Sequence, residues 1–390
     1  MARNIITGID IGTYQVKIVI AEYTKGKDRS FPRIIGTGFA ESKGLRHGYI
    51  INASDIIRSI KIALKQAEEA AQVRVKNAYL SIGGVGLEEV YSKGEVIITR
   101  ADGEITDLDT KKAFEDSEEK ARPKIANRKI IHTIPVTFRV DGLPVLGRAI
   151  GMRGSRLEVE TLLVTCLEQH LGDLIQAVEE AGVEVDDVMA SPIAASLITL
   201  TKAQKMAGCV LANIGSETVS IVVFEDNVPI SLKVFPIGST DITNDIALGL
   251  KVSLEEAEQI KRGAITGATY PKKKLDEIII ARLSDIFELI DNHLKKIGKN
   301  GLLPAGIIIT GGGSGIATIE DLAKAALKLP SKLATVRFGD RTKVKDSSWA
   351  VAYGLCVWGL TANEDDGPVG IQLAHKTRVN LVQWIKQFLP

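Results

Sequence analysis

The chain has 390 residues, which is enough for two or three domains with substantial apolar cores. Its 49 Lys and Arg nearly balance 48 Asp and Glu, so the formal net charge is +1. The overall charge therefore gives no reason to expect binding to nucleic acid. Its three cysteines, Cys166, Cys209 and Cys356, form no Cys-x-x-Cys pair, which is typical of a reduced cytoplasmic protein rather than a disulfide or zinc scaffold.

Residues 8–22 have the pattern of a β-hairpin whose tight turn at Gly12 and Thr13 can offer backbone N–H groups to an anion. Residues 213–225 repeat this pattern in step. The identical pairs are Ile11/Ile214, Gly12/Gly215, Val16/Val219, Ile18/Ile221, Val19/Val222 and Glu22/Glu225. A single copy is compatible with a merely buried hairpin, whereas two copies favour two facing turns that grip one polyphosphate.

Alternating strand and helix patterns over residues 1–83 predict the first part of an α/β domain. A strand is expected over 34–40. A helix capped by Asn52 or Ser54 follows, with apolar residues at helical spacing to about Ala71, and then a strand over 75–82.

Residues 84–165 are expected to form a compact α+β insertion in this domain. Thr106 and Asp109 are a capping-box variant that predicts a charged helix, which ends before Pro123. The strands expected around it are 96–99, 130–140 and 157–165.

The chain is then expected to return to the first domain over 166–205, with a helix that opens at Ser191 and Pro192. A second domain is expected to follow, in two parts separated by an inserted subdomain. These parts are 206–250, 251–300 for the insertion, and 301–360.

The insertion over 251–300 should contain a short helix over 253–262 that Ser253 caps. A Lys-rich turn over 272–274 should separate this helix from a long amphipathic helix over 275–297. Beyond it, the buried strand pattern over 306–310 runs into Gly311, Gly312 and Gly313. Such a turn lets a flat ring or a phosphate approach the backbone with no Cβ in the way.

A polar linker is expected over 361–377, followed by an amphipathic helix over 378–390. At about 100° per residue, its apolar side chains share one face. They are Leu381, Val382, Trp384, Ile385, Phe388 and Leu389. This design favours an anchor on an anionic membrane surface. The alternatives are docking on the protein's own core or in a partner's groove. No apolar run reaches the roughly 18 residues of a membrane-spanning helix.

The two glycine hairpins and the glycine triplet resemble those of the actin, sugar-kinase and heat-shock-chaperone ATPase superfamily. Within it, the chain resembles the bacterial cell-division FtsA family over essentially its full length. The segments that carry this resemblance are 46–50, 132–142, 151–158, 238–247 and the amphipathic tail. The resemblance implies an α/β, actin-like two-domain fold with a duplicated βββαβα-type core.

The resemblance also implies a function. The protein would bind ATP with Mg²⁺ between its domains and polymerise with itself into actin-like protofilaments. It would lie on the inner face of the cytoplasmic membrane at the division septum, where residues 251–300 would contact the tubulin-like protein FtsZ.

The resemblance assigns roles to individual residues but no catalytic residue. The first phosphate loop would include Gly12, Thr13, Tyr14 and Lys17, with Asp10 orienting Mg²⁺ through water. The second loop would include Asn213, Gly215, Ser216 and Gly238, while Glu258 and Lys261 would approach the nucleoside and Gly311, Gly312 and Gly313 would line the adenosine pocket.

Two departures from the family pattern lead us to expect very slow or absent ATP hydrolysis. The second loop usually reads Asp-Ile-Gly-Gly-Gly-Thr, but here Asn213 replaces the acid and Glu217 adds an anion near the expected phosphate. The connecting helix usually begins with Glu-Pro, but here it begins with Ser191. An in-line attack on phosphate needs an oriented water and neutralised charge.

Two alternative functions remain within the superfamily. A pilus assembly adaptor like PilM would share the fold and the insertion, although the insertion motifs and the tail favour FtsA. A sugar kinase is less favoured, because it needs a catalytic carboxylate that Asn213 and Ser191 do not supply.

Overall fold

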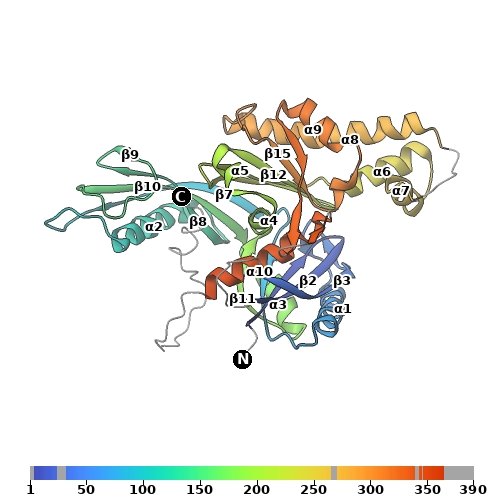
Figure 1. Cartoon of the computed structure of the whole chain (residues 1–390), viewed down its shortest axis with the longest axis horizontal. Coiled ribbons are helices and arrows are strands. Elements are labelled where there is room, and N and C mark those ends of the chain that lie inside the picture. Colours follow the sequence, from blue (N-terminus) through green and yellow to red (C-terminus); the bar gives the residue numbers. More distant parts are fainter. Residues whose placement is uncertain (1–3, 24–31, 265–269, 339–341, 345, 364–390) are drawn as a thin grey trace.

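The computed structural model describes residues 4–23, 32–264, 270–338, 342–344 and 346–363. Two five-stranded sheets form the cores of two domains (Figure 1). The first has the order β11 (Glu184–Ala190), β6 (Asn77–Ile82), β1 (Asn4–Ile11), β2 (Gln15–Tyr23), β3 (Arg33–Glu41). The second has the order β14 (Val228–Phe235), β13 (Val219–Glu225), β12 (Cys209–Ile214), β15 (Ile307–Thr310), β16 (Ser331–Leu333).

The two sheets share one topology, which confirms the duplication expected from the hairpins. In each, the first three strands in chain order form an antiparallel meander, and two later strands extend the sheet parallel to the first. In β12, Cys209 and Leu211 pack in one apolar core, whereas Val210, Ala212 and Ile214 pack in another. Because both faces are buried, β12 reads as a continuous apolar run.

Helices cover both faces of the two sheets (Figure 1). They are α1 (Ala53–Ala71), α3 (Glu168–Glu180), α4 (Ser191–Thr199), α5 (Lys202–Ala207), α6 (Ser239–Leu250), α7 (Leu254–Lys261), α8 (Lys272–Lys296), α9 (Ile319–Leu327) and α10 (Ala350–Asn363). The side-chain amide oxygen of Asn52 caps α1 by accepting from the Asp55 N–H, as expected. Between the domains, α10 packs on the first sheet, α4 contacts the second, and the two helices cross each other.

A third unit lies between β6 and α3 in sequence and projects to the left in Figure 1. Its sheet has the order β7 (Leu87–Ile97), β10 (Arg156–Leu167), β8 (Arg128–Val140), β9 (Leu143–Val145), and α2 (Asp107–Ala121) packs against it. Asp109 forms the expected capping box with Thr106 at the start of α2.

This unit docks on the edge strand β14 of the second domain. The Glu89 carboxylate accepts from the Leu232 N–H at 2.6 Å and from the Ser231 hydroxyl, and the Tyr91 hydroxyl donates to the Ile230 carbonyl. Glu89 and Tyr91 thus form hydrogen bonds with backbone groups of β14, at the edge of the second sheet where a further strand could otherwise pair.

Several element boundaries differ from expectation. The strand expected over 96–99 is the end of the long strand β7, whose charged first half is held by pairing with β10 from Leu87 onward. The segment 272–274 is not a turn but the first turn of α8. Two small hairpins also occur, β4 (Leu45–Arg46) with β5 (Tyr49–Ile50) and β17 (Val336–Phe338) with β18 (Thr342–Val344).

Within the described part of the chain, no helix has both the length and the apolar character needed to cross a bilayer. The expected linker and amphipathic tail lie outside the described residues, apart from the last residues of α10.

Candidate functional site: a cleft between two duplicated hairpins

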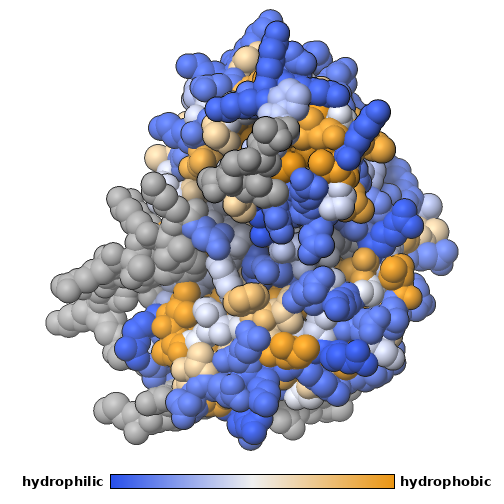
Figure 2. All heavy atoms as spheres, turned by 90° about the vertical axis from the view of Figure 1, so that its right-hand side faces the viewer, coloured by the Kyte–Doolittle hydropathy of each residue, from blue (hydrophilic) through white to orange (hydrophobic). Residues whose placement is uncertain are grey.

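A cleft of about 800 Å³ opens between the two domains. That volume lies within the range of small-ligand and cofactor sites. From the side of the α7 and α8 helices, the two lobes meet along a recess whose visible walls are largely hydrophilic (Figure 2). The cleft brings together most of the residues singled out from the sequence: Asp10, Gly12, Thr13, Tyr14, Lys17, Asn213, Gly215, Ser216, Glu258, Lys261, Gly311, Gly312 and Gly313.

The two hairpin turns have the same internal geometry. The Gly12 N–H donates to the Gln15 carbonyl at 3.2 Å, and the Gly215 N–H donates to the Thr218 carbonyl at 2.9 Å. A Cβ at Gly12 would lie 3.0 Å from the Gln15 oxygen, and one at Gly215 would lie 2.9 Å from the Thr218 oxygen. Glycine therefore keeps both turns tight, and the duplication extends to atomic detail.

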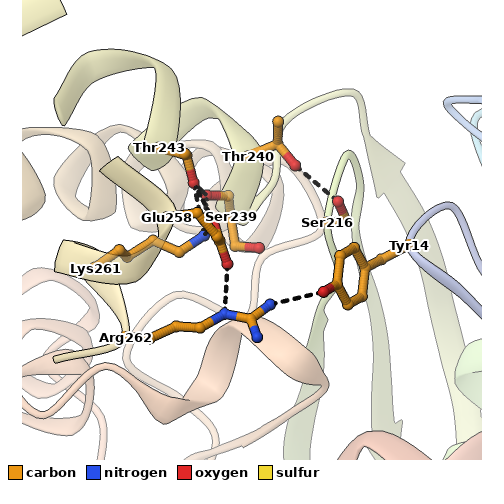
Figure 3. Close-up of polar contacts among 8 residues, drawn as sticks. All are labelled: Tyr14, Ser216, Ser239, Thr240, Thr243, Glu258, Lys261 and Arg262. Atoms are coloured by element: carbon orange, nitrogen blue, oxygen red, sulfur yellow. Dashed lines mark hydrogen bonds and ion pairs between the residues drawn. The ribbon is translucent and has the colours of Figure 1, made fainter. Parts of the chain in front are cut away.

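Gly238 does not line the cleft but supports it from behind. A Cβ there would lie 2.2 Å from the Ser216 carbonyl oxygen, so glycine lets the start of α6 approach the second turn closely. Two backbone hydrogen bonds fix this approach, from Ser239 to Gly215 at 2.9 Å and from Thr240 to Ser216 at 2.8 Å. The Ser216 and Thr240 hydroxyls add a third contact at 2.7 Å (Figure 3).

A partly buried carboxylate and a partly buried ammonium lie near the first turn. Burial raises the pKa of Asp10, while a hydrogen bond from the Ser81 hydroxyl (2.7 Å) and the charge of Lys17 oppose that rise. Burial lowers the pKa of Lys17, and Asp10 and Asp346 oppose that fall. The Lys17 ammonium donates to the Ser348 carbonyl at 3.0 Å, just before α10 begins.

The side chains around Asp10 could bind magnesium only together with the phosphate groups of a ligand. Among the residues that the structure describes, no three His, Cys, Asp or Glu side chains gather as a metal site. Magnesium keeps several waters and commonly binds through one or two carboxylates plus substrate phosphates. Asp10, as one carboxylate that lines the cleft, fits that requirement.

Glu258 and Lys261 lie on one side of the cleft in a dense polar network (Figure 3). The Lys261 ammonium donates to the Ser239 carbonyl (3.0 Å), the Thr243 hydroxyl (2.7 Å) and Glu258 (2.6 Å). These contacts use its three donors, so Lys261 ties α7 to the start of α6. Glu258 also accepts from Thr243 and from Arg262.

Arg262 extends the network across the cleft. Its guanidinium donates to the Tyr14 hydroxyl at 3.0 Å and lies 5.5 Å from the centre of the Tyr14 ring (Figure 3). Tyr14 belongs to the first hairpin turn, whereas Arg262 follows α7 of the second domain. This contact therefore spans the two domains at the cleft.

The Glu258 network predicts a stability change at acid pH. Burial alone would raise the pKa of Glu258, but hydrogen bonds from Lys261, Thr243 and Arg262 outweigh it and lower the pKa to about 2 from its ordinary value of 4.5. The ionised carboxylate therefore stabilises the fold above pH 4.5, and this contribution is lost as the pH falls through about 2. We expect Glu258→Gln to lower the melting temperature at neutral pH. The gap to the native protein should shrink below pH 4.5, and a gap that stays constant down to pH 2 contradicts this assignment.

The residues that depart from the family pattern lie in the same region. Asn213 and Ser191 both line the cleft. Glu217 is different, because its carboxylate accepts from the His47 N–H at 2.5 Å and is not part of the lining. The Glu217 side chain is therefore directed to the first domain, and the expectation that it adds an anion near the phosphate stays a prediction.

Sequence reasoning missed several lining residues, namely Thr240, Thr243, Arg262, Asp346 and Ser348. Arg262 directly follows Lys261 in sequence, and Thr243 lies one helical turn after Ser239 in α6. Their spacing could therefore have predicted that both residues lie near the cleft. No local pattern marked Asp346 or Ser348.

Comparison with known proteins places this geometry in a family. A model described as "Cell division protein FtsA" matches residues 210–354, and one described as "SHS2 domain inserted in FTSA" matches residues 84–165. The chain is 30% identical to cell division protein FtsA of Bacillus subtilis, covering 90% of this chain and 83% of that one. It is 28% identical to the FtsA of Pseudomonas aeruginosa, covering 93% and 91%.

Solved structures agree on the fold. A chain of a PilM–PilN type IV pilus biogenesis complex superposes with a TM-score of 0.69 at 17% identity, covering 91% of this chain and 98% of that chain. MreB5 of Spiroplasma citri bound to ADP superposes with a TM-score of 0.53 at 13% identity, covering 93% and 99%. The actin-like α/β fold expected from the sequence is thus confirmed, and this chain belongs to the cell division protein FtsA family.

Proposed function

We propose that this protein binds Mg·ATP in the interdomain cleft, polymerises into actin-like filaments and tethers FtsZ to the cytoplasmic membrane during division. The observation that carries the nucleotide part is the cleft itself. Two tight glycine turns and a glycine triplet face one space of about 800 Å³, with Asp10 and Lys17 beside the first turn. Backbone turns of this kind bind phosphate oxygens.

The space in front of the glycine triplet fits a flat ring. A Cβ built at Gly312, the first residue of the 3-10 helix η2 (Gly312–Gly315), has no heavy atom within 4 Å. Gly311 and Gly313, in contrast, pack closely on Ile214 of the second hairpin. The triplet therefore presents bare backbone to the cleft while it is fixed from behind, as an adenosine pocket requires.

We further propose that ATP acts as a structural ligand with very slow or no turnover. Asn213 and Ser191 line the cleft where the family carries carboxylates, and neither side chain can act as a general base. We expect steady-state phosphate release by the full-length protein to equal that of the Gly12→Val variant, whose turn is disrupted. Turnover clearly above that of the variant contradicts the proposal.

The membrane part of the proposal rests on the amphipathic face of residues 381–389, and the FtsZ part on the second inserted subdomain. On that subdomain Leu254 and Ile280 are exposed, at 60% and 39% of their surface, and Leu248 of α6, just before it, is exposed at 80%. Figure 2 shows apolar side chains gathering on the upper lobe, which carries α6, α7 and α8. Exposed apolar groups of this kind mark protein interaction sites.

Sedimentation with liposomes tests the tether. We expect the full-length protein to sediment with vesicles that contain anionic phosphatidylglycerol, and to carry purified FtsZ into the pellet. Truncation before Arg378 should abolish both. Replacing Leu248 and Leu254 with serine should abolish only the FtsZ part. If the truncated chain still sediments, the membrane part fails. If FtsZ sediments equally with the serine variant, this contact surface is wrong.

A pilus adaptor is the weaker alternative. The likeness to the PilM–PilN chain is one of fold, at 17% identity, whereas the FtsA relatives reach 28 to 30% over most of the chain.

A further inference from the structure

His47 and Gly48 form the two-residue turn of the hairpin between β4 and β5. His47 has a φ of +50°, in the left-handed region that non-glycine residues rarely adopt. Gly48, at φ +95°, packs so tightly that a Cβ would lie 2.6 Å from the Cα of Gly84. The Val85 N–H holds this turn by donating to the His47 carbonyl at 3.1 Å. Positive φ at both central residues is the geometry that a two-residue hairpin turn requires.

This turn presents His47 to the second domain. The His47 N–H donates to the Glu217 carboxylate at 2.5 Å. The His47 Nδ1 lies 3.2 Å from the Glu217 carbonyl oxygen. Because a carbonyl oxygen can only accept, Nδ1 is the donor in this second contact. One residue of the second phosphate turn is therefore held through both its side chain and its backbone.

We propose that Glu217 and His47 form a latch that keeps the two domains closed over the cleft whether or not a nucleotide is bound. The first contact is a hydrogen bond to a charged group, which is shorter and stronger than a neutral one. It joins positions 170 residues apart in the chain, on opposite domains. Gly48 and Gly84, next to the latch, line the cleft, so the latch lies at the cleft wall.

The Tyr14 to Arg262 contact alone does not hold the domains closed. Arg262 is an exposed side chain, 53% accessible, at the cleft rim. A contact of this exposed kind contributes little to stability. The latch, in contrast, has two contacts: the His47 backbone N–H donates to the Glu217 carboxylate, and the His47 side chain donates to the Glu217 carbonyl. Its turn is fixed by Val85 and Gly84. Glu89 and Tyr91 also join the inserted unit of the first domain to β14, but neither residue lines the cleft. Loss of the Glu217 carboxylate should therefore loosen the closed state at the cleft.

Distances between spin labels on the two lobes test the latch without using nucleotide binding as the readout. Lys61 on α1 and Glu277 on α8 are exposed. The helices α1 and α8 lie on the lower and upper lobes in Figure 1. Each is changed to Cys and labelled in the full-length chain. The native cysteines are buried and are not expected to react. Double electron–electron resonance then gives the distance distribution with and without Mg·ATP.

We expect one narrow distribution for the native chain, unchanged by Mg·ATP. Glu217→Ala should shift the distribution to longer distances and broaden it. The control Glu179→Ala, which removes an exposed carboxylate from α3, should leave it unchanged.

If Glu217→Ala does not fold, Glu217→Gln serves instead, because it keeps an acceptor oxygen without the charge and should broaden the distribution partly. A distribution for the Glu217 variants identical to that of the native chain overturns the latch. A native chain that is open without Mg·ATP overturns it as well. Neither result depends on whether the cleft binds ATP, so failure of the proposed function is distinguishable from failure of the latch.

Discussion

Gly312→Val is expected to weaken Mg·ATP binding about 100-fold while leaving the fold intact. A Cβ at this position meets no protein atom within 4 Å, so the turn has room for a side chain. The new side chain would fill the volume in front of the glycine triplet, where the adenosine is proposed to bind. Overlap of that size typically costs about 1–3 kcal/mol, and about 2.7 kcal/mol corresponds to a 100-fold loss of affinity. Displacement of a fluorescent ATP analogue measures the change.

The matched control is Gly172→Val. Gly172 is an exposed glycine in α3, a Cβ there also meets nothing within 4 Å, and it does not line the cleft. We expect its affinity for Mg·ATP to equal that of the native protein. If both variants bind ATP as the native protein does, the nucleotide is not in front of Gly312.

A large loss of stability is expected for Gly354→Val, at the crossing of α10 and α4. A Cβ at Gly354 would lie 2.0 Å from the Ala194 carbonyl oxygen and 2.6 Å from its carbonyl carbon. Both are backbone atoms, so the helices must separate to admit a side chain. We expect the free energy of unfolding to fall by about 3 kcal/mol.

Urea unfolding of Gly354→Val, with Gly172→Val beside it, measures this loss. Both substitutions replace glycine by valine inside a helix, so their difference isolates the helix crossing. Equal midpoints for the two variants would show that the junction adapts, and that α4 and α10 are not in fixed contact.

The parts of this fold that local patterns specify were predictable from the sequence. The hairpins around Gly12 and Gly215 combine apolar strands with a tight turn, and their in-step repetition predicted the duplicated sheets. The Asn52 cap and the Thr106 capping box are contacts between near neighbours, and both formed as expected. Glycine at 311–313 predicted a turn where a ligand can approach the backbone, because none of the three residues carries a Cβ.

What the sequence did not show depends on partners far away in the chain. The direction of the Glu217 side chain is set by the His47 N–H, and the position of Arg262 by the Tyr14 hydroxyl. The first half of β7 carries Glu88 and Glu89 and lacks a strand pattern, but pairing with β10 and docking on β14 make it a strand. The predicted turn over 272–274 was wrong because these lysines belong to α8, which packs on α6 and α9.

The measurement that tests the central claim most directly is a calorimetric titration of the full-length protein with ATP in the presence of Mg²⁺. The duplicated turns, Asp10 and the glycine triplet predict saturable binding of one ATP per chain. They also predict that this binding is lost in the Gly12→Val variant, whose side chain would press against the Gln15 carbonyl. No heat of binding at millimolar ATP would contradict the nucleotide assignment and leave an actin-like scaffold that works without a nucleotide.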